Sequence, residues 1–237
     1  MSAAAGLGAA AWVAAMAGSR TESHVADFIR QEASAIAKGT NLVNVVLADV
    51  RSLDTLMETL VVVLGALGVV GLVKGVERAD QGRLVRGEST TAAGGLLPGL
   101  AKVIVPIGVI FAVAMLIKGH NEPGGGFVAG LSLGVTAMIA LAAFGPLRFV
   151  RRLRASASTV AILGCGLMFF SGGLGAFGGD PYLTQLHGQV AIGALRVPLH
   201  STLIFDLGVM LAVAGGITAA GLALWTIPRR ELPGDLP

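Results

Sequence analysis

Charged residues are scarce in this sequence, and that scarcity is the first guide to its class. Only 13% of the 237 residues are Asp, Glu, Lys or Arg, whereas a soluble globular domain carries roughly 25%. So few charges leave most of the chain without groups that water solvates well. The charges that exist gather in short stretches, between apolar runs of the length that crosses a hydrocarbon core of ~30 Å. The sequence therefore predicts an integral membrane protein.

Cysteine and aromatic residues are also scarce, and each scarcity excludes a class of function. The single cysteine, Cys165, has no intrachain disulfide partner, and the sequence has no Cys and His spacing typical of a metal or redox centre. We therefore expect no cofactor and no enzymatic activity in this chain. Aromatic residues make up 5% and do not alternate with basic ones. The net charge of +3 is thus typical of basic membrane-protein loops and does not indicate nucleic-acid binding.

Apolar runs predict an all-α polytopic fold with about six transmembrane helices. The runs are continuous, unlike the alternating strands of a membrane β-barrel. They are Ala3–Ala17, Thr55–Val73, Gly99–Ile117, Phe127–Phe144, Ser158–Gly172 and Ser201–Ile227. The first run ends in a small-residue pattern like a signal-peptidase site, but no basic residue precedes it. We interpret it as a retained first helix.

Lysine and arginine residues lie unevenly among the predicted loops. If the chain alternates across the membrane, three strongly basic regions fall on one side. The positive-inside rule then places both termini in the cytoplasm. We expect the membrane to be the inner membrane of the cell. These regions contain Lys74, Arg78, Arg83, Arg86, Arg148, Arg151, Arg152, Arg154, Arg229 and Arg230. A polar stretch at 76–98 divides the chain into a two-helix unit at 1–75 and a four-helix domain at 99–228, with a short tail at 229–237.

Two stretches carry a family resemblance. Gly119–Phe127 reads GHNEPGGGF and Phe205–Val209 reads FDLGV, and together they resemble the MrpB or MnhB family, the B subunits of Mrp-type multisubunit Na⁺/H⁺ antiporters. Asn41–Glu58 resembles the C-terminal end of the large MrpA subunit, which corresponds to the small MbhE subunit of membrane-bound hydrogenases. That end of MrpA usually reads Asp-Phe-Arg and Gly-Glu, where this chain has Asp49-Val50-Arg51 and Met57-Glu58.

The resemblance implies a fusion of an MrpA-type tail to an MrpB-type subunit. It also implies partners: large antiporter-like subunits, small C-type, F-type and G-type subunits, lipid, and the transported Na⁺ and H⁺. It implies one component of a larger complex, not a chain that transports ions alone.

Carboxylates inside apolar segments are the first candidates for an ion path, because a charge within a span costs roughly 2.5–3.5 kcal/mol. Asp54 and Glu58 are spaced i, i+4 on one helical face, with Asp49 just before them. Paired carboxylates can bind Na⁺ through oxygen or pass protons, so Na⁺ near Glu58 and Asp54 is one hypothesis, although no metal site is firmly predicted. In the alternative, Asp54 caps the helix and Glu58 pairs with a neighbouring subunit.

The connection Gly119–Phe127 is predicted to be a tight turn on the outer side. Gly119, Pro123, Gly124, Gly125 and Gly126 suit a rigid hairpin that docks a neighbour, which is the interpretation we favour. In the alternative, its titratable residues His120 and Glu122 form a relay for protons or Na⁺. Further along, Gly126, Gly130 and Gly134 recur every four residues and predict a helix-packing face.

Three further titratable residues lie in or beside predicted helices. Lys102, near the start of the third segment, either extends to the interface or contributes to a proton path. Asp206 and His200 lie near the outer end of the last segment. The predicted topology places all four histidines toward that side, where they could share a role in sensing or relaying protons; they are His24, His120, His187 and His200.

Three functions remain open from the sequence. The first is a subunit of an Mrp-type cation/proton antiporter that contributes to the Na⁺ path and to assembly. The second is the same module within a membrane-bound hydrogenase or related respiratory complex, in which redox energy drives ions. The third is a scaffold subunit without an ion path of its own.

Overall fold

The structure of the chain is a computed structural model, and it describes residues 41–79, 96–119, 121–153, 155–177, 179–192 and 195–225, together with Ala11, Asp27 and Gln31. Side chains are not described for residues 49–50, 76–79, 152, 187–192 and 195–199. The described residues do not include His24, His120, most of the polar linker, the C-terminal tail or, apart from Ala11, the predicted first segment.

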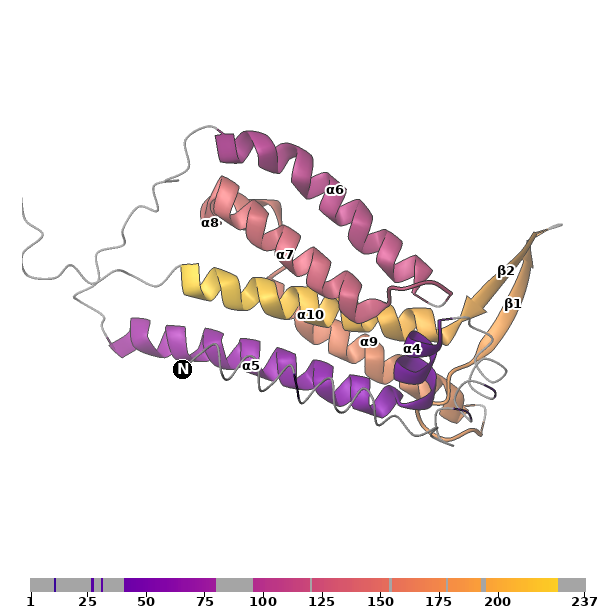
Figure 1. Cartoon of the computed structure of the whole chain (residues 1–237). Helices are drawn as coiled ribbons and strands as arrows, with labels where there is room; N and C mark the ends of the chain where they lie inside the picture. Colours follow the sequence, from indigo (N-terminus) through magenta and orange to yellow (C-terminus); the bar gives the residue numbers. More distant parts are fainter. Residues whose placement is uncertain are drawn as a thin grey trace, which may run out of the picture.

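Five long helices form the described membrane part of the chain, and each is long and apolar enough to cross a bilayer. They are α5 (Ser52–Ala79), α6 (Leu96–Lys118), α7 (Gly126–Phe144), α9 (Ala157–Phe177) and α10 (Ser201–Trp225), shown in Figure 1. Each coincides with one predicted segment, from the second to the sixth, so the prediction of an all-α polytopic membrane protein is confirmed. The fifth predicted segment, the shortest of these, is a full helix of 21 residues.

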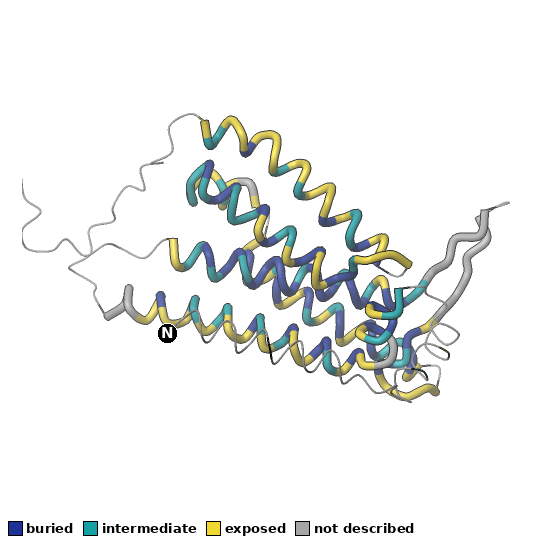
Figure 2. Tube along the Cα trace, viewed as in Figure 1, coloured by how far each residue is buried: buried dark blue, intermediate teal, exposed yellow. Residues whose placement is uncertain are grey.

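Helix α10 is the centre of the bundle. It contacts α9, α7 and α5, and 61% of its membrane window is buried, against 17% for α6. Figure 2 shows the same contrast, with α10 mostly buried and α6 mostly exposed along the outside of α7. The main apolar core lies between α10, α5 and α9. Its largest fully buried members are Phe205, Leu56, Met168, Val209 and Val213.

Small residues let the backbones of neighbouring helices approach closely. A methyl group added at Gly130 would lie 2.9 Å from the Met210 carbonyl oxygen of α10, and one at Gly134 would lie 3.0 Å from the Ile217 side chain. On α9, a methyl group at Gly164 would overlap the Ala212 backbone of α10. Lipid tails give apolar helices no hydrophobic reason to associate, so close packing of this kind is a main source of their affinity.

The two ends of the bundle differ in structure. At one end, called the hairpin end, lie helix α4 (Leu42–Val45), the π-helix η2 (Val46–Val50), the loop between α6 and α7, and the strands β1 (His187–Ile192) and β2 (Leu195–His200). At the other, called the arginine end, the short helix α8 (Pro146–Arg152) follows α7. Figure 1 shows α4 and the strands grouped together, far from α8.

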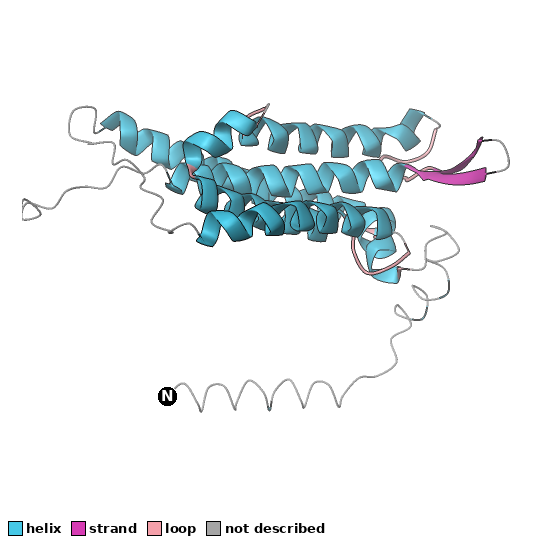
Figure 3. Ribbon diagram, turned by 90° about the horizontal axis from the view of Figure 1, so that it is seen from above, coloured by secondary structure: helices cyan, strands magenta, loops and turns pink. Residues whose placement is uncertain are grey.

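The two strands are not among the elements predicted from the sequence. They form an antiparallel hairpin in which His187 pairs with His200 and Gln189 with Pro198. Proline is tolerated here because both strands of a two-stranded sheet are edges. Figure 3 shows the hairpin projecting beyond the helices.

Candidate functional site

A buried carboxyl group lies at the hairpin end of the central helix. Asp206, in the second turn of α10, is 5% exposed. The side-chain amide of Asn44 donates a hydrogen bond of 3.1 Å to its Oδ2, and the backbone N–H of Gly126 donates another. Buried polar groups are normally satisfied in this way. Asp206 thus connects the N-terminal unit, the start of α7 and α10.

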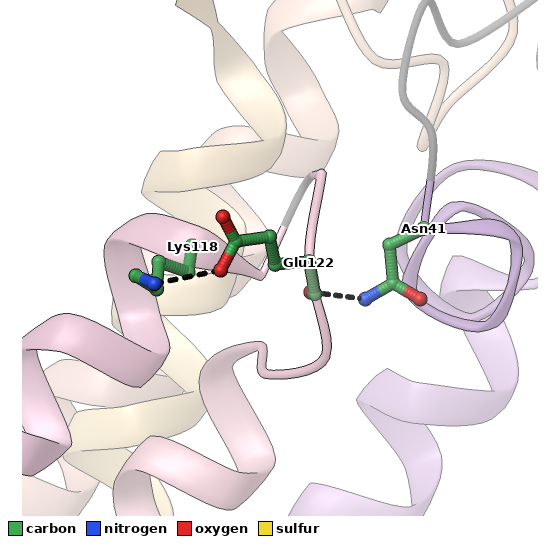
Figure 4. A network of polar contacts seen from close by, with 3 residues as sticks. All are labelled: Asn41, Lys118 and Glu122. Carbon is green, nitrogen blue, oxygen red and sulfur yellow. Dashed lines mark hydrogen bonds and ion pairs between the residues drawn. The ribbon is translucent and has the colours of Figure 1, made fainter.

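Two asparagines of the N-terminal unit hold this arrangement in place. Asn41 caps α4, since its side-chain oxygen accepts a hydrogen bond of 3.4 Å from the backbone N–H of Asn44. Its amide nitrogen donates to the carbonyl oxygens of Gly119, at 2.8 Å, and Glu122, at 2.7 Å. Figure 4 shows the second of these contacts. Asn41 therefore fixes the loop between α6 and α7, while Asn44 binds Asp206.

The glycines of the loop are required by the close approach of these groups. Gly125 has φ of +110°, in the backbone region that residues other than glycine rarely adopt. A methyl group at this position would overlap the side-chain oxygen of Asn44. A methyl group at Gly126 would overlap the backbone of Asp206. The GGG sequence thus serves the contact between the loop, the N-terminal unit and α10.

Further buried polar side chains lie at the same end of the bundle. The Ser201 hydroxyl donates to Gln185 Oε1 at 2.6 Å, and the Ser171 hydroxyl donates to the Ser201 carbonyl at 2.9 Å. The Ser52 hydroxyl donates to the carbonyl of Leu183 at 3.4 Å. Among the described residues, the side-chain nitrogen of Gln185 is buried without a partner. The hairpin end is therefore polar inside as well as at its surface.

The predicted carboxylates of α5 are placed differently from Asp206. Asp54 forms an ion pair with Arg51 in the first turn of the helix. Glu58 is exposed on the outside of the bundle, where its neighbours Met57 and Val61 are also exposed, at 53% and 69%. Within the described ranges Glu58 makes no hydrogen bond or ion pair.

The remaining predicted residues are dispersed. Lys118 and Glu122 form an exposed ion pair of 2.7 Å at the hairpin end, drawn in Figure 4. Lys102 is exposed near the other end of α6, far from Asp206. His200 is half-buried at the junction of β2 and α10. Asp49 lies in η2, but its side chain is not described. Pro123 is exposed in the loop.

The sequence reasoning did not single out Asn41 or Asn44, although both belong to the motif that carries the MrpA resemblance. A signal was present for Asn41, because asparagine is one of the residues preferred at the N-cap of a helix. The partner of Asn44 is 162 residues away, which no local pattern indicates.

The chemistry available at Asp206 is that of one carboxyl group beside one amide. Such a pair can hold a proton or supply oxygen ligands to a hard cation. The residues that the structure describes contain no group of three His, Cys, Asp or Glu side chains that could hold a metal ion. Asp206 is therefore the centre of a buried polar contact that links the N-terminal unit, the start of α7 and α10.

Comparison with known proteins matches two families to different parts of the chain. The family described as a domain related to the MnhB subunit of Na⁺/H⁺ antiporter matches residues 96–219. The family MbhE, described as the E subunit of MBH, matches residues 1–83.

Several relatives share one or both parts. The chain is 29% identical over 223 residues to a probable K⁺/H⁺ antiporter A/B subunit of Rhizobium meliloti, covering 84% of this chain and 22% of the relative. It is 33% identical over 121 residues to the Na⁺/H⁺ antiporter B subunit of Alkalihalophilus pseudofirmus, covering 51% of this chain and 84% of the relative. The chain thus spans about a fifth of the first relative and most of the second.

Solved structures contain the same fold. A chain of the Mrp complex from Dietzia sp. DQ12-45-1b superimposes with a TM-score of 0.73 at 32% identity, covering 96% of this chain and 25% of that one. A chain of an archaeal respiratory membrane complex, the membrane-bound sulfane sulfur reductase, superimposes with a TM-score of 0.71 at 20% identity, covering 94% and 96%. At that identity the second likeness shows the fold alone.

Proposed function

Because the chain belongs to the family of MnhB subunits of Na⁺/H⁺ antiporters, with an MbhE-type segment before the MnhB domain, we propose that it is a membrane subunit of an Mrp-type cation/proton antiporter complex. In this role it replaces both the C-terminal part of MrpA and a separate MrpB. Its partners are large antiporter-like subunits and small C-type, F-type and G-type subunits. The basic arginine end faces the cytoplasm, following the positive-inside rule.

The observation that carries this proposal is the buried contact between the two parts. Asn44 of the MbhE-type part binds Asp206 of the MnhB part, and Asn41 binds the loop at Gly119 and Glu122. These contacts join the two parts into one folded unit, as a fused protein requires. We keep the division into a unit at 1–75, a linker at 76–98, a domain at 99–228 and a tail at 229–237.

Glu58 is the residue that we assign to the cation path. It lies six residues after Ser52, roughly 9 Å along α5 at 1.5 Å per residue. A carboxylate at that depth on an exposed apolar face is costly in lipid, so it requires a cavity with water or a group from a neighbouring subunit. We propose that Na⁺ passes between this chain and a neighbouring subunit, with Glu58 on one side of the route and the neighbour on the other. Asp54 and Asp49 lie near the outer entrance of this route.

The test is the Glu58→Gln substitution in the complete complex. Na⁺/H⁺ exchange is measured with a pH-sensitive dye in membrane vesicles from cells that lack other antiporters, and assembly is followed on native gels. We expect the complex to assemble and exchange to be strongly reduced. The matched control is Asp180→Asn, which removes an exposed carboxylate after the end of α9 and should leave exchange near the unsubstituted level. Unchanged exchange with Glu58→Gln would leave only the scaffold role.

The shared fold with a component of a respiratory complex keeps a redox-driven assembly as a second candidate. Purification of the native complex distinguishes the two, since a redox-driven complex contains subunits with iron–sulfur cysteine motifs. Robust exchange by this chain alone in liposomes would contradict its role as one component among several.

A further inference from the structure

An apolar cavity lies at the arginine end, remote from the polar groups of the hairpin end. Its volume is about 290 Å³, close to the lower end of the ~300–1,000 Å³ typical of ligand pockets. Residues from five helices line it, among them Val105, Ala137, Phe149, Val160 and Gly215. We propose that this cavity binds an acyl chain of an anionic phospholipid, whose headgroup is held by arginines of α8.

The wall of the cavity offers no free polar group in the part of the chain that the structure describes. Its two hydroxyls, Thr136 and Thr218, donate hydrogen bonds of 2.7 Å to the carbonyls of Ser132 and Ala214 within their own helices. The other lining residues are aliphatic, aromatic or glycine. A cavity of this kind does not hold ordered water, which needs two to four polar partners. Its occupant must therefore present hydrocarbon.

Helix α8 carries arginines next in sequence to residues that line the cavity. Phe149, and Leu153 directly after the helix, line the cavity, and the exposed residues Arg148 and Arg151 lie beside them in the sequence. Neither arginine forms an ion pair within the described ranges. A guanidinium group binds phosphate through two parallel hydrogen bonds. An apolar cavity whose lining residues Phe149 and Leu153 are flanked in sequence by exposed arginines therefore complements a phospholipid with a net negative headgroup.

The position of the cavity favours lipid over a soluble ligand. Helices α6, α7, α9 and α10, which line it, are membrane-length helices, so hydrocarbon borders the bundle where the cavity lies. Basic pockets between membrane helices are known sites for anionic lipid headgroups. Helix α6 contributes Val105 and Val109 to one wall, and Figure 2 shows this helix mostly exposed along the outside of the bundle.

The experiment uses the full chain in nanodiscs of phosphatidylcholine that contain a trace of phosphatidylglycerol with a photoactivatable diazirine on its acyl chain. After irradiation, cross-linked peptides are located by mass spectrometry. We expect cross-links at cavity residues of α7 and α10, and we expect unlabelled phosphatidylglycerol to displace them better than phosphatidylcholine. Arg148→Gln with Arg151→Gln should reduce this preference by about fivefold per arginine, equivalent to ~1 kcal/mol each.

Cavity-filling variants test the acyl-chain site itself. Val160→Phe should lower cross-linking in the cavity about tenfold, which corresponds to ~1.4 kcal/mol of binding. Ile162→Phe is the matched control, since Ile162 lies on the same helix, is 56% exposed and does not line the cavity. Ala137→Phe fills the cavity from α7 and serves if Val160→Phe fails to give a folded, helical protein.

Three results would overturn the proposal. The first is unchanged cross-linking in a folded cavity-filling variant. The second is equal displacement by phosphatidylcholine and phosphatidylglycerol. The third is cross-linking of the cavity peptides, in the native complex, to another subunit and not to lipid. None of these results bears on Glu58, so the lipid site and the proposed antiporter role fail independently.

Discussion

The hydrogen bond between Asn44 and Asp206 is the contact whose removal we expect to separate the two parts of the chain. Replacing Asn44 by Ala leaves the Asp206 carboxyl group, 5% exposed, with the backbone N–H of Gly126 as its remaining donor. Loss of one buried hydrogen bond costs about 1 kcal/mol between neutral groups and about 1.5–3 kcal/mol when one group is charged. Asp206→Ala should cost a similar amount, because it leaves the Asn44 amide buried without an acceptor.

A double-mutant cycle separates this contact from the other effects of each substitution. The free energy of unfolding is measured for the full chain in mixed micelles by titration with dodecyl sulfate, followed by circular dichroism. The double variant should be more stable than the sum of the single losses predicts, by between about 1 and 3 kcal/mol. Energies that add within ~0.5 kcal/mol would refute the reasoning, because independent sites behave in that way.

One pair of substitutions tests packing and one single substitution tests surface charge, both with the same assay. Gly164→Ala should destabilise the chain by about 1–3 kcal/mol, because the added methyl group overlaps the backbone of Ala212. Gly166→Ala, two positions along the same helix and facing open space, should instead stabilise the chain by up to ~1 kcal/mol. Equal effects of the two substitutions would contradict the close approach of α9 and α10. Glu122→Gln should cost less than ~1 kcal/mol, since its ion pair with Lys118 is exposed. The cost should shrink further in high salt, and a larger loss would give the pair a structural role.

The sequence predicts the helices well and the contacts between them poorly. Apolar runs mark helices because length and hydropathy are local properties, and Gly126, Gly130 and Gly134 indicate a packed face for the same reason. The partner of Asn44 is not a local property. The exposure of Glu58 also depends on which face of α5 meets α10, and an all-round apolar helix carries no periodicity that reveals this. The β1–β2 hairpin was missed because its apolar, glycine-containing stretch is short and bounded by a long irregular loop.

The distribution of polar groups inside the bundle indicates where a cation can pass. Below Asp206, the neighbouring core positions of α10 are Val209 and Val213, both buried and apolar, and the Thr218 hydroxyl is already bonded within its own helix. A cation that entered at Asp206 would find one unpartnered hydroxyl, that of Thr59 on α5, buried in the core of the described bundle. One further oxygen is too few to replace the ligands of a desolvated cation. The surface of α5 differs, because Glu58 lies exposed on it, where a neighbouring protein can contact it. These facts support the proposed cation route between this chain and a neighbour over a route through the middle of this chain.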